Sequence, residues 1–122
     1  MDRFFIRCGS ISAFISVLAG AFGAHALRAR ISPDHLAAFE TGARYQMYHA
    51  LALLAVAWLA SRGNSPTTLW AGRLFIIGTV LFSGSLYLIA LTGVTGFGAV
   101  TPFGGIALLA GWITLALAAK RV

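Results

Sequence analysis

The stretch FETGARYQMYHALALLAVAWLA, residues 39–60, decides the fold, because it sets many hydrogen-bonding side chains directly before an uninterrupted apolar run. The apolar part suits a helix inside a membrane, where every backbone N–H and C=O group needs a partner within the protein. The polar part includes Tyr45, Gln46 and His49, and their side chains need partners as well. The stretch therefore predicts a transmembrane helix with a polar site at one end.

The composition of the whole chain also indicates a membrane protein. Hydrophobic residues make up 59% of it and charged residues 10%, whereas soluble domains average about 25% charged residues. Its mean hydropathy is +0.86. A chain of 122 residues has room for four spans of about 20 residues and for no separate soluble domain. We therefore expect one transmembrane domain over residues 1–122.

The expected fold is all-α, an integral membrane bundle of four transmembrane helices with a short interfacial helix between the first and second spans. Ser32-Pro33, Ser65-Pro66 and Thr101-Pro102 predict helix starts, because a hydroxyl caps free N–H groups and proline suits the first helical position. The helix starting at Pro33 has apolar and polar sides and is expected to lie in the interface until the chain turns inward near Gly42. The spans are expected at about 11–27, 43–60, 69–91 and 102–119, and the interfacial helix at about 33–41.

The first span has two interpretations. Its basic flank and the triplet Ala24-His25-Ala26 also fit a cleavable signal peptide, but cleavage would leave only three hydrophobic spans, so we expect a retained helix. Within it, small residues recur every four positions and predict a ridge where another helix of the same chain approaches closely. These residues are Ser12, Ser16, Gly20 and Ala24. A homodimer seam is the alternative use of such a ridge.

The basic residues indicate the orientation. The net charge is +6, yet Lys and Arg lie at span ends and in connections, so we expect no nucleic-acid partner. Six of the nine share one side, namely Arg3, Arg7, Arg62, Arg73, Lys120 and Arg121. Three lie on the other side, namely Arg28, Arg30 and Arg44. The excess predicts that both termini are cytoplasmic. The single cysteine, Cys8, predicts neither a disulfide nor a zinc site.

Helical geometry predicts two polar groups at the start of the second span. Antiparallel packing of the first three spans predicts a buried cluster about 7–8 Å inside the membrane boundary. Its predicted members are His25, Tyr45, Gln46, His49 and Tyr87. Glu40 and Arg44 are i,i+4 neighbours in the favourable order and predict an interfacial ion pair at the rim of the cluster.

Three segments carry a family resemblance: GAFGAHAL (20–27), FETGARYQMYHALALL (39–54) and FSGSLYLIALTG (82–93). They resemble the YgdD/YwdK-like family of small membrane proteins, a domain-of-unknown-function family with an animal transmembrane relative. The resemblance covers nearly the whole chain. It implies four transmembrane helices and a location in the bacterial inner membrane, and it supplies no activity, substrate or cofactor.

Three classes of function follow from these residues. The first is a non-enzymatic structural or accessory component, for which we expect the lipid bilayer as a partner and leave a homo-oligomer and a larger membrane complex open. Lipid-facing aromatics favour it, namely Phe14, Phe22, Phe75 and Trp112. The second is binding or transport of a small solute, ion or proton through the cluster around His49. The third is an enzyme or metal site, which we do not expect.

The residues argue against the third class. Side chains capable of metal ligation include His25, His35, Glu40 and His49. They form no ligand pair at a fixed spacing such as HExxH. The serines do not fall into the order of a catalytic triad with a histidine and an acid. We therefore expect no catalytic residue, no metal and no cofactor.

Overall fold

The computed structural model describes residues 1–120 and confirms the all-α class, since no strand occurs in that range. The first helical rod is α1 (Asp2–Val17), continued by the π-helical segment η1 (Leu18–Gly23) and by α2 (Ala24–Leu27). The others are α3 (Pro33–Arg62), α4 (Pro66–Thr92) and α5 (Thr101–Ala119), with a 3₁₀ turn, η2 (Thr95–Ala99), before α5. Arg121, which was counted for the orientation, lies outside the described residues.

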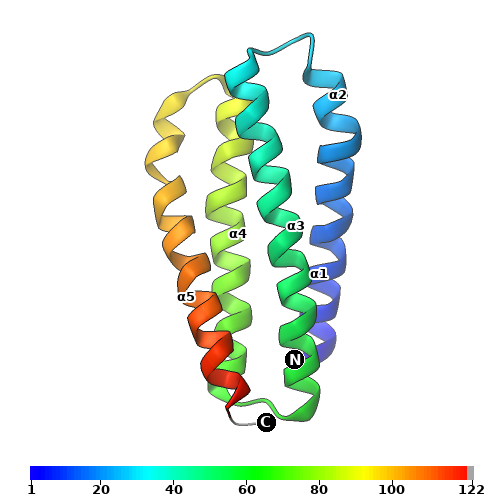
Figure 1. Ribbon diagram of the computed structural model, residues 1–122, viewed down its shortest axis with the longest axis vertical. Coiled ribbons are helices and arrows are strands. Elements are labelled where there is room, and N and C mark those ends of the chain that lie inside the picture. Colours follow the sequence, from blue (N-terminus) through cyan, green and yellow to red (C-terminus); the bar gives the residue numbers. More distant parts are fainter. Residues whose placement is uncertain (121–122) are drawn as a thin grey trace.

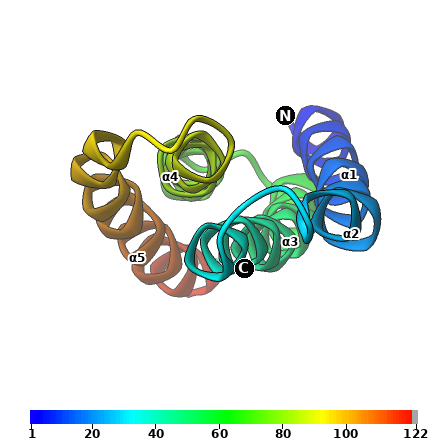
Figure 2. The ribbon, with the colours of Figure 1, turned by 90° about the horizontal axis from the view of Figure 1, so that it is seen from above.

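The rods run side by side in an up-and-down order (Figure 1). Seen from above, they form an open, staggered row, with α3 and α4 in the middle and α1 and α5 outside (Figure 2). Each rod packs mainly on its neighbour in the chain: α1 on α3, α3 on α4, and α4 on α5. The arrangement is therefore more open than the bundle expected from the sequence.

The expected interfacial helix at 33–41 is wrong as a separate element. Gly42 is helical and buried, and α3 continues through it as one helix of 30 residues. The chain does not turn at Gly42 because α4 packs there. A Cβ on Gly42 would lie 3.0 Å from the Tyr87 ring and 3.3 Å from the Ser83 carbonyl oxygen. The glycine thus serves close packing between two helices and not a bend.

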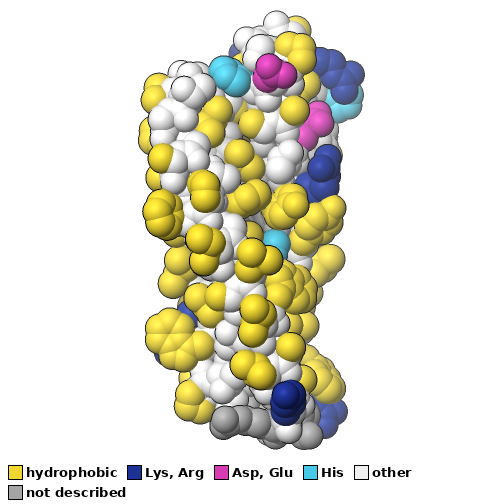
Figure 3. Space-filling model, turned by 60° about the vertical axis from the view of Figure 1, so that its left-hand side comes forward, with side chains coloured by type: hydrophobic (Ala, Val, Ile, Leu, Met, Phe, Trp, Pro, Cys, Tyr) yellow, Lys and Arg dark blue, Asp and Glu magenta, His cyan; other side chains and the backbone are white. Residues whose placement is uncertain are grey.

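Within residues 1–120, three helices are long and apolar enough to cross a membrane: Asp2–Leu27, Pro66–Thr92 and Thr95–Ala119. The fourth rod, α3, is not among them, because polar side chains occupy its first half. On the face that Figure 3 shows, acidic side chains lie toward the upper end, basic side chains lie toward both ends, and hydrophobic side chains cover most of the length between them. This distribution suits a molecule that has its middle in a bilayer.

Two of the three predicted helix starts have the expected cap. The Ser32 hydroxyl accepts from the His35 backbone N–H, and the Ser65 hydroxyl accepts from that of Thr68, both at 3.2 Å. Thr101 differs, because it is the first residue of α5 and makes no cap bond there. Its hydroxyl lies 2.5 Å from that of Ser85 and joins α5 to α4 instead.

Close approach of small residues holds the row together. In a bilayer, helices associate through packing and hydrogen bonds, because lipid is as apolar as the protein. At the α4–α5 seam, a Cβ on Gly111 would lie 2.8 Å from the Phe75 ring and one on Gly78 would lie 2.6 Å from Leu108. Phe75 is fully buried, so its expected lipid-facing position is wrong: the missing side chain of Gly111 makes room for its ring.

Candidate functional site

His49 lies near the middle of α3 and is buried, with 4% of its surface exposed. Its Nδ1 lies 2.6 Å from the Tyr45 carbonyl oxygen, and its Nε2 lies 3.0 Å from Nε1 of Trp112 on α5. A carbonyl oxygen only accepts hydrogen bonds, and an indole N–H only donates them. The imidazole is therefore neutral, with its proton on Nδ1 and a lone pair on Nε2 directed at Trp112.

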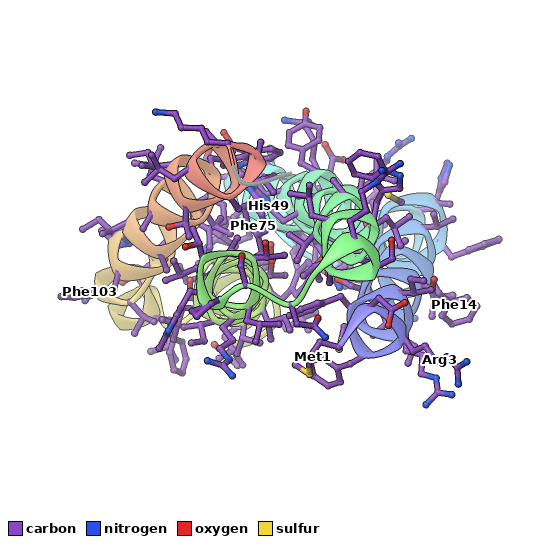
Figure 4. All side chains as sticks on the ribbon, turned by 90° about the horizontal axis from the view of Figure 1, so that it is seen from below. Met1, Arg3, Phe14, His49, Phe75 and Phe103 are labelled. Carbon is purple, nitrogen blue, oxygen red and sulfur yellow. The ribbon has the colours of Figure 1, made fainter. Side chains whose placement is uncertain are left out.

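Aromatic rings pack around this imidazole. The Phe75 and Trp112 rings meet edge to face at 68° with a centroid distance of 5.0 Å, and the His49 ring centroid lies 5.7 Å and 5.8 Å from theirs. From below, His49 and Phe75 lie among the helices, while Phe14 and Phe103 point outward (Figure 4). The Phe75 and Trp112 rings thus pack directly against the imidazole, and we call His49, Phe75 and Trp112 the His49 group.

Gln46 forms a second polar group one turn earlier on α3. The Tyr87 hydroxyl of α4 donates to Gln46 Oε1 at 2.6 Å. Gln46 Nε2 donates to the Ser12 carbonyl and hydroxyl oxygens of α1, both at 3.2 Å. Gln46 thereby joins three helices with both ends of its amide. We call Ser12, Gln46 and Tyr87 the Gln46 network.

Two further serines fix the positions of α1 and α4 along α3. The Ser16 hydroxyl of α1 donates to the Ala43 carbonyl oxygen at 2.6 Å. The Ser83 hydroxyl of α4 donates to the Gly42 carbonyl oxygen at 2.7 Å. Since Ser12 and Ser16 both contact α3, the small-residue ridge packs within the chain, as the sequence predicts. Each bond fixes the register of one helix pair.

The predicted cluster thus divides in two and loses one member. Gln46 and Tyr87 are bonded to each other, and His49 faces α5 instead. Tyr45 is 38% exposed and contributes its carbonyl oxygen. His25 is exposed on α2 and joins neither group, which corrects the prediction. The reason is helical: Ala24 faces the core, and the next residue is turned by about 100°.

The expected ion pair between Glu40 and Arg44 is also absent. Among residues 1–120, the structure has one ion pair, between the Met1 ammonium group and Asp2 at 3.8 Å. An exposed i,i+4 pair gains only tenths of a kcal/mol, too little to hold two long side chains together. Glu40 and Arg44 instead both line a groove between α1 and α3.

The sequence missed Trp112 and Ser12 as partners. Trp112 was expected to face lipid, and it is 45% exposed, yet its indole N–H is turned inward to His49. Ser12 was predicted only as a small packing residue. A signal for Trp112 was present: a buried histidine needs a donor or acceptor at its own height, and α5 offers an indole there.

Chemically, the arrangement binds helices to one another. No group of three or more His, Cys, Asp or Glu side chains comes together among the described residues. An open groove of about 520 Å³ does reach His49, between α3, α4 and the first half of α5. A second groove of about 460 Å³ lies between α1 and α4 and reaches Gln46. Both are lined mainly by apolar side chains.

Comparison with known proteins places the chain in a family. Residues 19–105 match the family model described as "Protein of unknown function (DUF423)". The protein belongs to the DUF423 family. The matched range includes the whole of α3 and α4, and with them His49, Gln46 and Tyr87. The YgdD/YwdK-like resemblance is confirmed by the relatives.

Three relatives of this DUF423 protein cover almost its full length. The UPF0382 membrane protein YwdK of Bacillus subtilis is 46% identical over 98% of this chain and 98% of its own. The UPF0382 membrane protein SERP0230 of Staphylococcus epidermidis is 44% identical over 98% and 97%. The UPF0382 inner membrane protein YgdD of Escherichia coli is 41% identical over 99% and 92%. No solved structure matches the chain.

Proposed function

We propose that this protein is a non-enzymatic structural or accessory component of the bacterial inner membrane, in which the polar side chains of α3 join the helices. The pairing of both His49 ring nitrogens carries the proposal. One nitrogen faces a group that only accepts and the other a group that only donates. A relay would have to put a proton on Nε2, where the indole N–H already points.

Four transmembrane spans with cytoplasmic termini are part of this proposal. α3 has 30 residues, so it is about 45 Å long and exceeds the roughly 30 Å of a hydrocarbon core. It lies between α1 and α4, two candidate spans. α1 begins and α5 ends at the same end of the molecule (Figure 1), where Arg62 and Arg73 add positive charge. The name of the E. coli relative supports an inner-membrane location.

The alternative is binding or transport of a small solute, ion or proton through the polar groups around His49. The groove of about 520 Å³ beside His49 and Trp112 favours it. The volume lies within the range of about 300–1,000 Å³ that small-molecule sites have. Transport of a proton would, however, require the His49–Trp112 hydrogen bond to break in each cycle.

Thermal unfolding in mild detergent tests the structural function. His49→Ala leaves the Trp112 indole unpaired and should cost about 1–3 kcal/mol, the penalty of a buried unsatisfied donor. His49→Gln should recover part of the loss, because the amide oxygen accepts from the indole. Trp112→Phe should be non-additive with His49→Ala, with a coupling of about 0.6 to 1.7 kcal/mol. Exposed His25 supplies the matched control, since His25→Ala should change stability by less than about 0.5 kcal/mol.

Two results would refute the structural function. One is an unchanged Tm for His49→Ala, since the loss of a hydrogen bond that joins α3 to α5 should lower stability. The other comes from vesicles that hold the purified protein and an internal pH dye. We expect proton flux equal to that of protein-free vesicles under an imposed potential. Flux above that level, lost in His49→Gln, would establish the transport function instead.

A further inference from the structure

We propose that the groove between α1 and α3 binds the headgroup of an aminophospholipid, with phosphoethanolamine as the recognised group. The groove has a volume of about 350 Å³, and Glu40, Arg44, Met47, Tyr48, Val17 and Gly20 are among its lining residues. It lies away from the His49 group, which faces α5. The inference goes beyond the structural function, and it depends on α3 crossing the bilayer.

The two charges of the groove match those of the headgroup. Glu40 and Arg44 both line it, and neither forms an ion pair within residues 1–120. They are one turn apart, which sets their Cβ atoms about 5–6 Å from each other. In phosphoethanolamine an ethyl linker joins an anionic phosphate to an ammonium group. The Arg44 guanidinium suits the phosphate, and the Glu40 carboxylate suits the ammonium.

The height of the groove suits a lipid headgroup. Arg62 lies over the Trp58 ring at 4.4 Å, and Arg73 over the Trp70 ring at 5.2 Å. Such pairs of tryptophan and arginine are typical of the membrane boundary. Counted along α3, Glu40 lies about 27 Å from Trp58 at a rise of 1.5 Å per residue. Since a hydrocarbon core is about 30 Å thick, Glu40 lies close to the headgroup level of the opposite leaflet. Arg44 lies about 21 Å from Trp58 by the same count, and its long side chain extends toward that level.

The walls of the groove leave room for the rest of the lipid. Gly20 belongs to the π-helical segment of the first rod, and a Cβ there would still lie 3.9 Å from Ala43. One wall therefore has almost no side chain at this point. Met47 on the other wall is long and flexible and adapts to an acyl chain. The charged groups thus lie beside an apolar path toward the membrane interior.

Retention of lipid by the purified protein, read by native mass spectrometry, tests the inference. We expect the wild type to retain phosphatidylethanolamine over phosphatidylglycerol, which has no ammonium group, and over phosphatidylcholine, whose methylated ammonium cannot donate to Glu40. Glu40→Gln should lower phosphatidylethanolamine retention about two- to fivefold, to the level of phosphatidylglycerol, a size typical of exposed charge pairs. Arg44→Gln should lower the retention of both lipids.

Matched controls lie at the same end of the molecule. Asp34→Asn on α3 and Arg30→Gln before it remove the same charges outside the groove and should leave retention unchanged. Equal retention of phosphatidylglycerol and phosphatidylethanolamine by the wild type would overturn the inference, and so would a Glu40→Gln variant that behaves as wild type. If water-soluble glycerophosphoethanolamine at equal concentration displaces phosphatidylethanolamine, the groove recognises the free headgroup and not a lipid, which would also overturn the inference. None of these outcomes alters the stability test at His49.

Discussion

The seam between α4 and α5 offers a sharp test of the packing, because two adjacent glycines on α5 meet very different surroundings. A Cβ on Gly104 would lie 2.8 Å from Phe82 Cα and closer still to its backbone nitrogen. A Cβ on Gly105 would lie 3.9 Å from the Phe82 ring, an ordinary contact. We therefore predict that Gly104→Ala is destabilising and that Gly105→Ala is not.

The magnitude follows from the displacement that the new methyl group requires. Ordinary contact begins at 3.4 Å, so α5 must move from Phe82 by at least about 0.6 Å, and backbone atoms cannot rotate aside. A gap of that size costs neighbouring contacts about a quarter to a half of their dispersion energy. Gly111 against Phe75 and Gly78 against Leu108 belong to the same seam. Overpacking of this kind costs about 1–3 kcal/mol.

The assay compares the free energy of unfolding of the two variants in the same detergent. Both gain the higher helix propensity of alanine, about 1 kcal/mol, so this gain cancels in the comparison. Gly104→Ala should therefore be about 1–3 kcal/mol less stable than Gly105→Ala. Equal stability of the two variants would refute the reasoning, because it would mean that α5 does not approach the backbone of α4 at Phe82.

Two further variants test the contacts of α4 with its other neighbours. Tyr87→Phe removes the donor to Gln46 Oε1 and should lower stability by about 0.6–1.7 kcal/mol. Tyr48→Phe is the control, because its ring is exposed and the change should have no effect. Equal melting curves for the two variants would contradict the Gln46 network. Gly72→Ala would bring a Cβ within 2.9 Å of Phe5 Cδ1 and should lower Tm. Adding Phe5→Leu to this variant should restore part of the lost Tm. If the effects of the two substitutions on Tm simply add, this contact is contradicted.

The helices were predictable from sequence because their signals are local. Ser32 and Ser65 each precede a proline and cap the helix that follows, as expected. Gly42 misled the prediction for the opposite reason. A glycine beside polar residues is typical of a turn, but this one makes room for the Tyr87 ring, which is distant in sequence. Whether a glycine marks a turn or a close contact between helices depends on which helix packs against it, and the sequence alone does not show which helix that is.

The sequence predicted the central residues of the candidate site, Gln46 and His49, but not which helices supply their hydrogen-bond partners. Gln46 and His49 follow from one rule, that polar side chains on an apolar helix must be satisfied. Which helix satisfies each one depends on rotation about the axis. Gln46 and His49 are about 60° apart on α3, enough for one to face α1 and α4 and the other α5. Treating them as one face predicted a single cluster.

In the proposed arrangement of four spans, the position of α3 in the row explains how a helix with a polar first half would enter a bilayer. An outer helix exposes one side to lipid, where an unpaired amide or imidazole costs several kcal/mol. α3 has α1 on one side and α4 on the other, and the second half of α5 approaches His49. Each of its buried polar side chains has a partner on another helix. The least apolar helix of the chain is therefore placed where its neighbours supply the hydrogen bonds that lipid cannot.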